Sequence, residues 1–338
     1  MQYGRDKPGG HWNQWSSRKA LYDDPAFAKN SNIKGVAWTF PWSMLEGPTQ
    51  GDYSAGFALI DNEIRYLKSL PAPKRFILKI VDYAWDTPCP SVMVPAYVSN
   101  NGWVMNMPSG STPLCKVKHW DANMQTAFNA LIAAYGARYD SEPYFEGFIP
   151  HEESSIAIPA GSGGSDAAWM TQTKRMVDQL ASSFPTTNVL LAVNWVPGGL
   201  TRTQELMAYM KSKGVGQFSV DSCRIGDSWC DSGIWGDQVF LGVSGGIDYR
   251  GSIPSWSGAE TSEMGYDSVG PAGGYTAAQL AAWANGTLRA SHIIWDYNEF
   301  VGTSLQRWST GMLPYINQNP TPTYRACPSV YVGGYKSD

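Results

Sequence analysis

Three segments of the sequence place carboxylate side chains directly after apolar runs that are typical of strands. The first contains His151, Glu152 and Glu153, the second spans residues 256–263, and the third spans residues 295–297. Hydrolysis of a glycosidic bond needs one protonated carboxyl to assist the leaving oxygen. It also needs one ionised carboxylate to attack the anomeric carbon or to activate water. The first two segments contain the glutamates that this chemistry requires, and the third offers an indole on which a sugar ring could stack.

Eight β-rich runs alternate with helical segments along the chain. The predicted strands are residues 2–5, 33–40, 75–81, 144–150, 188–195, 216–220, 253–260 and 292–295. Several are nearly continuous apolar runs, as expected for strands that are buried on both faces of a parallel sheet. The predicted helices are residues 57–70, 123–138, 166–184, 201–213, 276–288 and 303–315, with Thr201 and Thr276 at N-cap positions.

This alternation predicts an α/β fold, a (β/α)8 barrel with long rim loops that forms one domain over residues 1–338. One alternative remains, because residues 238–243 also resemble a strand and could replace one of the eight. The surrounding Gly, Trp and Ser residues favour a long loop there. Active sites of such barrels form at the carboxyl ends of the strands, so the residues that follow each strand are the candidates for binding and catalysis.

Acids and tryptophans dominate these strand ends. Trp and Tyr number 15 and 18 against 11 Phe, and side chains with an apolar face and a polar tip suit a partly hydrated groove. The predicted substrate-binding residues are Trp38, Trp42, Asp82, Trp85, His151, Asn194, Trp195, Asp221 and Trp295. The five tryptophans are expected to be sugar platforms, and His151 is expected to orient a neighbour. The two aspartates are expected either to bind hydroxyls or to hold rim loops.

The charge pattern excludes several classes of partner. The net charge is −4 with a sequence pI of about 5.6, and no basic run occurs, which argues against nucleic acid and anionic membranes. No apolar stretch reaches the roughly 20 residues that span a bilayer. No His/Cys cluster has metal-ligand spacing. We therefore expect a monomer that needs no metal or cofactor and binds a polysaccharide or oligosaccharide.

The five cysteines are consistent with disulfides in a secreted protein. Cys223 and Cys230 are close enough in sequence to close a loop. Cys89 and Cys115 bracket a segment without helical or strand periodicity. Both pairs are candidate disulfides, and the odd count leaves one thiol over.

Two further stretches resemble a known family. Residues 35–53, GVAWTFPWSMLEGPTQGDY, are similar to the second-strand signature of barrel glycoside hydrolases of the cellulase and β-galactosidase superfamily. Residues 94–98, VPAYV, resemble the Pro-x-Tyr turn after the third strand of its β-galactosidase-like members. The resemblance implies a retaining mechanism, with an acid/base glutamate after strand four and a nucleophile after strand seven. Carried onto this chain, these are Glu152 and Glu260, and the Trp295 strand resembles the one that floors the reacting subsite.

The chain departs from the family pattern at two places. His151 stands where the family usually has Asn, and the doubled acid makes Glu153 an alternate to Glu152. Ala259 is an extra residue before Glu260, so Glu263 is the alternate nucleophile. The expected activity is endo-acting cleavage of a β-linked polysaccharide. A non-catalytic carbohydrate-binding barrel and a polysaccharide lyase on the same scaffold are the alternatives. We interpret Glu46 as structural, capping the turn before Gly51.

Overall fold

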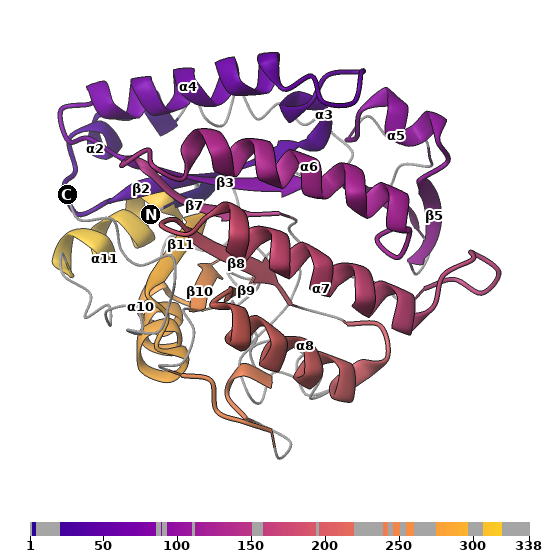
Figure 1. Ribbon diagram of the computed structural model, residues 1–338. Coiled ribbons are helices and arrows are strands. Elements are labelled where there is room, and N and C mark those ends of the chain that lie inside the picture. The colour runs from indigo at the N-terminus through magenta and orange to yellow at the C-terminus, as the bar shows by residue number, and fades with distance from the viewer. Residues whose placement is uncertain are drawn as a thin grey trace.

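Eight parallel strands close into a barrel in the order β1-β11-β10-β9-β8-β7-β3-β2 (Figure 1). The computed structural model describes residues 2–4, 21–85, 89, 93–109, 112–150, 158–193, 196–219, 239–242, 246–250, 255–259, 275–296 and 307–319. The closed parallel sheet and the helices between its strands confirm the predicted (β/α)8 fold.

Every barrel strand overlaps one of the predicted strands. The strands are β1 (Gln2–Gly4), β2 (Gly35–Pro41), β3 (Arg75–Val81), β7 (Phe145–Ile149), β8 (Asn188–Ala192), β9 (Gly216–Ser219), β10 (Ser255–Ala259) and β11 (His292–Asp296). The alternative strand at residues 238–243 does not enter the barrel in its described part. Leu241 instead forms an isolated antiparallel bridge with Asp248.

Helices cover the outside of the barrel, and α4, α6, α7 and α8 lie along one side of it in Figure 1. The helices are α2 (Pro25–Ala28), α3 (Trp42–Leu45), α4 (Ser54–Ser69), α5 (Ala96–Asn100), α6 (Ala122–Tyr139), α7 (Asp166–Ser183), α8 (Gly199–Lys213), α10 (Ala277–Ala281) and α11 (Leu313–Gln318). Two π-helical segments, η2 (Ala282–Leu288) and η3 (Trp308–Met312), extend α10 and precede α11.

The two predicted N-caps have different outcomes. Thr276 caps α10 through a capping box with Gln279, as its sequence position predicts. The prediction for Thr201 is wrong, because α8 begins at Gly199 and its N-cap is Gly198. Gly198 has a φ of 89°, a left-handed conformation that glycine adopts without steric cost. The helix therefore begins two residues before the threonine.

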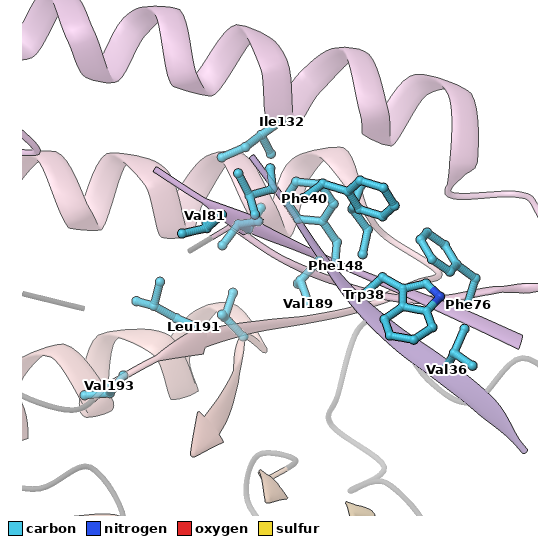
Figure 2. Packing of buried hydrophobic residues seen from close by; sticks show 14 of the residues in the cluster. Val36, Trp38, Phe40, Phe76, Val81, Ile132, Phe148, Val189, Leu191 and Val193 are labelled. Carbon is cyan, nitrogen blue, oxygen red and sulfur yellow. The ribbon is translucent and has the colours of Figure 1, made fainter. Parts of the chain in front are cut away.

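Side chains of the strands alternate between two apolar layers. Val36, Trp38 and Phe40 of β2 point away from the barrel axis and pack with residues such as Ile132 of α6 in the main core (Figure 2). The inward positions form a smaller cluster inside the barrel, made of Ala37, Ile77, Ile149, Leu190, Ala192, Phe218 and Ile294. Because the side-chain period of a strand is two, one residue decides which layer a side chain enters.

A second sheet follows β3 directly. It is antiparallel and has the order β4-β6-β5, with β4 (Tyr83–Trp85), β5 (Val104–Ser109) and β6 (Thr112–Val117). The prediction that residues 89–115 lack strand structure is wrong. Prolines at 108 and 113 lie opposite each other next to the β5–β6 turn and interrupt the alternating pattern. Since β4 starts two residues after β3 ends, this sheet lies at the carboxyl end of the barrel.

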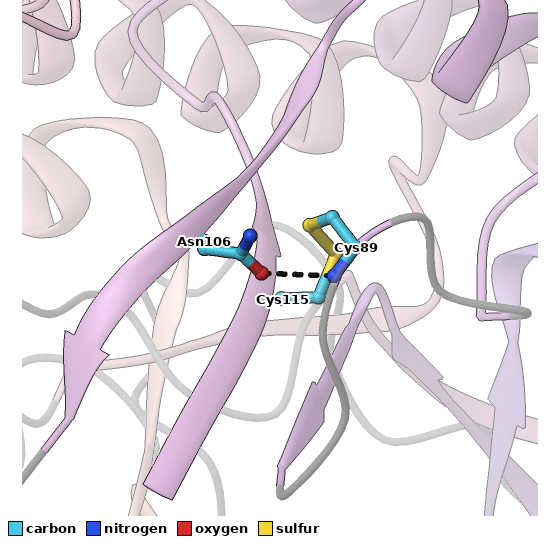
Figure 3. The surroundings of a disulfide bond; sticks show 3 residues. All are labelled: Cys89, Asn106 and Cys115. Carbon is cyan, nitrogen blue, oxygen red and sulfur yellow. Dashed lines mark hydrogen bonds between the residues drawn. A yellow bond between two sulfur atoms is a disulfide. The ribbon is translucent and has the colours of Figure 1, made fainter. Parts of the chain in front are cut away.

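A disulfide between Cys89 and Cys115 links the chain after β4 to β6, which confirms one of the two predicted pairs (Figure 3). The backbone N–H of Cys89 also donates to Asn106 Oδ1 of β5 at 2.8 Å. All three strands of the small sheet are thereby connected beside the barrel mouth. Cys223 and Cys230 lie outside the described residues, so their pairing stays a prediction.

Removing this bond is expected to destabilise the protein. The bond closes a loop with a sequence separation of 26 residues, and the chain-entropy model assigns such a loop about 3.5 kcal/mol of unfolding free energy. A Cys89→Ser/Cys115→Ser double variant should therefore unfold at a clearly lower urea concentration. Cys327→Ser serves as a control because Cys327 does not take part in this bond. Equal midpoints for the double variant and the unmodified protein would contradict the expectation.

Polar side chains fill the amino-terminal end of the barrel. Arg75 Nη1 donates to Glu146 Oε2 at 2.8 Å, and His292 Nε2 lies 3.1 Å from Glu146 Oε1. Burial lowers the pKa of His292 despite its bond to Glu146. Burial by itself would raise the pKa of Glu146, but the bonds from His292 and Arg75 outweigh it and hold that pKa below its ordinary value. Residues at this end of such barrels contribute to stability, while chemistry takes place at the other end.

Stability is expected to fall as the pH drops below about 6.5, the ordinary pKa of histidine. The unfolded chain protonates His292 there while the folded protein still resists, so unfolding takes up a proton and stability rises with pH. Below about pH 4.3 the lowered pKa of Glu146 adds a further loss in the same direction. Urea unfolding between pH 5 and 7 should show a smaller pH slope in His292→Gln. An unchanged slope would show that other groups cause the dependence.

Candidate active site

The barrel topology brings the ends of β7 and β10 to the same rim. In chain order they are the fourth and seventh barrel strands, and β8 and β9 separate them around the barrel. β7 ends at Ile149, three residues before Glu152, and β10 ends at Ala259, directly before Glu260. Since all barrel strands are parallel, both segments leave the barrel at its carboxyl end. This is the arrangement that the two-carboxylate prediction requires of the backbone.

Many predicted site residues lie outside the described residues. These are His151, Glu152, Glu153, Asn194, Trp195, Asp221, Glu260 and Glu263. The side chain of Trp85 is likewise outside them, although its backbone belongs to β4. Their roles therefore stay predictions. The structure supports these predictions only through the ends of the strands that precede the residues.

Trp38 is not a sugar platform, which corrects the sequence prediction. Its side chain is 2% exposed and points outward from β2 into the layer between sheet and helices (Figure 2). Its Nε1–H donates to the hydroxyl of Tyr22 at 2.5 Å, and the Tyr22 ring packs against its edge. The prediction failed because Trp38 lies three residues before the end of β2, at an outward position.

The prediction that Trp42 is a sugar platform is also wrong, because its side chain is 0% exposed. It belongs to the short helix α3, where its ring packs edge-on against Phe128 at a centroid distance of 4.8 Å. Its Nε1–H donates to Glu46 Oε2 at 2.7 Å. The indole therefore fixes the chain that leaves β2.

Glu46 has the structural role that the sequence predicted. Its Oε1 accepts the backbone N–H of Gly51 at 2.7 Å, and its Oε2 accepts Trp42 Nε1–H and the hydroxyl of Tyr97. Burial raises the pKa of Glu46, although the three hydrogen bonds act in the opposite direction. Gly51 has a φ of 85°, so the turn that Glu46 closes depends on glycine at this position.

Trp295 is the third platform that the structure corrects. It is 3% exposed and packs at a centroid distance of 6.0 Å on Tyr315 of α11, outside the barrel. Register explains this position, because Trp295 pairs with Ala259 while its neighbour Ile294 belongs to the interior cluster. The platform role proposed for tryptophans now depends on Trp85 and Trp195.

Asp82 lies at the rim directly after β3, but it is buried and its carboxylate is engaged. Its Oδ2 is 2.6 Å from His119 Nε2, and His119 lies in the turn between β6 and α6. Two roles were predicted for Asp82, and this contact supports the one in which it holds a rim segment. The prediction that Asp82 binds substrate is wrong, because its carboxylate is buried against His119. The pair attaches the small disulfide-bonded sheet and the start of α6 to the end of β3.

Lys79 of β3 is a buried charged residue that the sequence analysis did not single out. The signal was present, because Lys79 interrupts the apolar run from Phe76 to Val81. Because both faces of β3 are buried, the side chain of Lys79 does not reach solvent.

No metal site is formed by the described part of the chain, where no group of three or more His, Cys, Asp or Glu residues could hold an ion. Among the same residues, no helix is long and apolar enough to cross a membrane.

The comparisons with known proteins agree with the barrel topology. No family model and no curated protein matches the sequence, whereas solved structures do match the fold. The catalytic domain of a β-amylase from Paenibacillus polymyxa has a TM-score of 0.58 at 9% identity, over 99% of this chain and 96% of that one. The two chains share a barrel fold.

Two glycoside hydrolases of family 5 are similar in the same way. One is from Bifidobacterium longum, in complex with Manβ1-4GlcNAc, with a TM-score of 0.55 at 13% identity over 97% of this chain and 79% of that one. The other is from Prevotella bryantii, in complex with a xyloglucan tetradecasaccharide, with a TM-score of 0.52 at 12% identity over 94% and 91%. At these identities the likeness concerns the fold.

Proposed function

We propose that the protein is a glycoside hydrolase that cleaves β-linked polysaccharide with retention of anomeric configuration. The observation that carries the proposal is the backbone arrangement at the barrel mouth. The fourth and seventh strands both lead into glutamates at the carboxyl rim of one closed barrel. In the proposed mechanism Glu152 protonates the leaving oxygen while Glu260 attacks the anomeric carbon. Glu152 then activates the water that hydrolyses the glycosyl-enzyme.

The structural neighbours support a carbohydrate substrate. Two family 5 enzymes with the same fold were solved with bound oligosaccharides, one of them a xyloglucan fragment of fourteen sugars. By analogy we propose an extended groove and endo-acting cleavage for this chain, with Trp85 and Trp195 as platforms. Fold analogy by itself does not define function, because this barrel hosts many reactions. Among these reactions we favour acid/base hydrolysis, because a glutamate follows both the fourth and the seventh strand in the sequence.

We also propose that the protein is secreted and acts as a monomer. The disulfide between Cys89 and Cys115 supports an oxidising compartment, in which such bonds persist. A low net charge without basic runs is consistent with a substrate that is a neutral sugar polymer.

A panel of β-linked glucan, mannan, galactan and xylan, assayed for new reducing ends, tests the function. A hydrolase releases reducing ends, a lyase produces an unsaturated sugar that absorbs in the ultraviolet, and a carbohydrate-binding barrel leaves the polymer intact. Proton NMR of the first product then tests the mechanism. Retention gives the β-anomer before mutarotation, and an initial α-anomer would overturn the retaining proposal.

A further inference from the structure

One sequence motif has no role in the proposed hydrolysis, the run Asn285-Gly286-Thr287. It has the form Asn-x-Ser/Thr, with x not proline, that accepts N-linked glycans in secreted proteins. It is the only such run in the sequence, because Asn319 is followed by the proline that excludes transfer. So short a motif often occurs by chance. Its meaning therefore depends on whether the folded chain has room for a glycan at Asn285.

The motif lies in the π-helical segment η2, on the outside of the barrel. This segment continues α10 and leads through residues 289–291 into β11. The N–H of Ser291 donates at 2.9 Å to the carbonyl of Ser255, the first residue of β10, so the turn after η2 lies at the amino end of the barrel. In Figure 1, α10 lies at the lower left, far from strand β5 of the small sheet on the right. A glycan on Asn285 would therefore be attached far from the carboxyl rim.

The amide of Asn285 has its nitrogen toward solvent. The residue is half-buried, and its Oδ1 is a buried atom without a hydrogen-bond partner in the described part of the chain. Its Nδ2 is not among the buried atoms that lack a partner, and no described residue accepts a hydrogen bond from it, so this nitrogen reaches solvent. An N-linked glycan is attached through this nitrogen. An inward oxygen and an outward nitrogen are thus the orientation that a folded glycoprotein needs.

The neighbours of Asn285 leave space for a sugar. Gly286 is exposed, and a Cβ atom added to it would meet no described atom outside its own segment within 4 Å. Thr287 is half-buried, and its carbonyl accepts Arg250 Nη1–H at 3.3 Å, which fixes this end of η2. The buried side of the segment is formed by Trp283, Ala284 and Leu288. The segment therefore buries its apolar residues and leaves the acceptor nitrogen accessible.

We infer that Asn285 is the acceptor of an N-linked glycan in cells that attach such glycans to secreted proteins. The inference rests on the proposed secretion and is independent of the proposed hydrolysis. The donor is an oligosaccharide linked to a lipid through pyrophosphate, and an oligosaccharyltransferase catalyses the transfer. Asn285 Nδ2 forms a C–N bond with the anomeric carbon of the first sugar and loses one proton to a base of the transferase. The bond from that carbon to the pyrophosphate oxygen breaks, and the lipid pyrophosphate leaves with the bonding electrons.

The test is secretion of the full chain from yeast behind a cleavable signal peptide, with intact mass measured before and after treatment with peptide-N-glycosidase. Most molecules of the unmodified protein should carry one glycan. The glycosidase should remove it and leave aspartate at position 285, which peptide mass spectrometry detects. Asn285→Gln and Thr287→Ala should each carry none. A secreted protein with the mass of the bare chain, or a glycan that persists in Asn285→Gln, overturns the inference.

Gly163→Asn is the matched control, because it creates a second acceptor motif over residues 163–165, again with glycine in the centre. Gly163 is exposed, and asparagine tolerates its φ of 78° better than most other residues with a side chain. The variant should carry two glycans. A glycan at position 163 together with a bare Asn285 would show that the cell modifies this chain but not at Asn285, which overturns the inference.

The glycan and the hydrolysis are measured separately on the same secreted protein. A glycosylated protein that releases no reducing ends from any polysaccharide would disprove the proposed function and keep the acceptor site. Hydrolysis by a secreted chain that carries no glycan would disprove the acceptor site alone.

Discussion

Glu260→Gln is expected to lower kcat/KM by about 10⁴-fold or more, the loss typical of a removed nucleophile. The amide has the shape of the carboxylate but cannot form the glycosyl-enzyme, so folding and substrate binding should persist. Glu152→Gln should cost about 10²- to 10⁴-fold, as expected for a general acid, and less on substrates whose leaving group needs no proton. Steady-state kinetics on one active polysaccharide and on an activated aryl glycoside measures both losses.

Matched variants decide between neighbouring glutamates. Glu153→Gln and Glu263→Gln should keep most of the activity, since their side chains are assigned no chemical role. If Glu153→Gln abolishes turnover while Glu152→Gln remains active, the acid/base role belongs to Glu153. The same comparison between Glu263→Gln and Glu260→Gln decides which residue is the nucleophile. Such a result at Glu153 would mean that Glu153, and not Glu152, faces the barrel mouth after β7.

Small anions separate the two roles by stereochemistry. In Glu152→Ala, azide can attack the glycosyl-enzyme and give a β-glycosyl azide from an activated β-glycoside. In Glu260→Ala, azide replaces the missing nucleophile and gives the α-glycosyl azide. Exchanged products would reverse the assignment of Glu152 and Glu260, and the anomeric proton coupling in the NMR spectrum distinguishes them.

Trp42→Ala is expected to reduce the free energy of unfolding by about 3–5 kcal/mol, the usual cost of removing a buried aromatic side chain. The fully buried ring packs edge-on against Phe128 and Tyr97, and its N–H is bound by the buried Glu46. Urea unfolding measures this loss. The folded fraction should still bind oligosaccharide with unchanged affinity, which isothermal titration calorimetry can verify.

Trp42→Phe separates the contribution of the ring from that of its hydrogen bond. This variant keeps most of the aromatic packing but removes one donor from Glu46, at an expected cost of about 1–3 kcal/mol. If Trp42→Ala instead keeps its stability and loses sugar affinity, the indole is a sugar platform and its structural role is disproved.

The sequence was sufficient for the fold because barrel strands are buried on both faces. Runs such as Phe76-Ile-Leu and Val189-Leu-Leu are apolar at successive positions, a pattern that neither a surface strand nor an amphipathic helix produces. The disulfide-bonded sheet was missed for the opposite reason. Its strands are short, and proline interrupts both β5 and β6, so no period dominates the segment.

The sequence by itself also determined which residue types stand at the strand ends, and hence the acid/base chemistry proposed for Glu152 and Glu260. Tertiary structure decided which side chains face the mouth. Trp38 and Trp295 lie close to strand ends, yet both side chains point away from the barrel axis. The register between neighbouring strands decides which face of the sheet each residue occupies, and a shift of one residue would reverse it. The contact of Lys79 with Phe218 likewise depends on β3 and β9 lying across one closed barrel, a proximity that sequence distance does not contain.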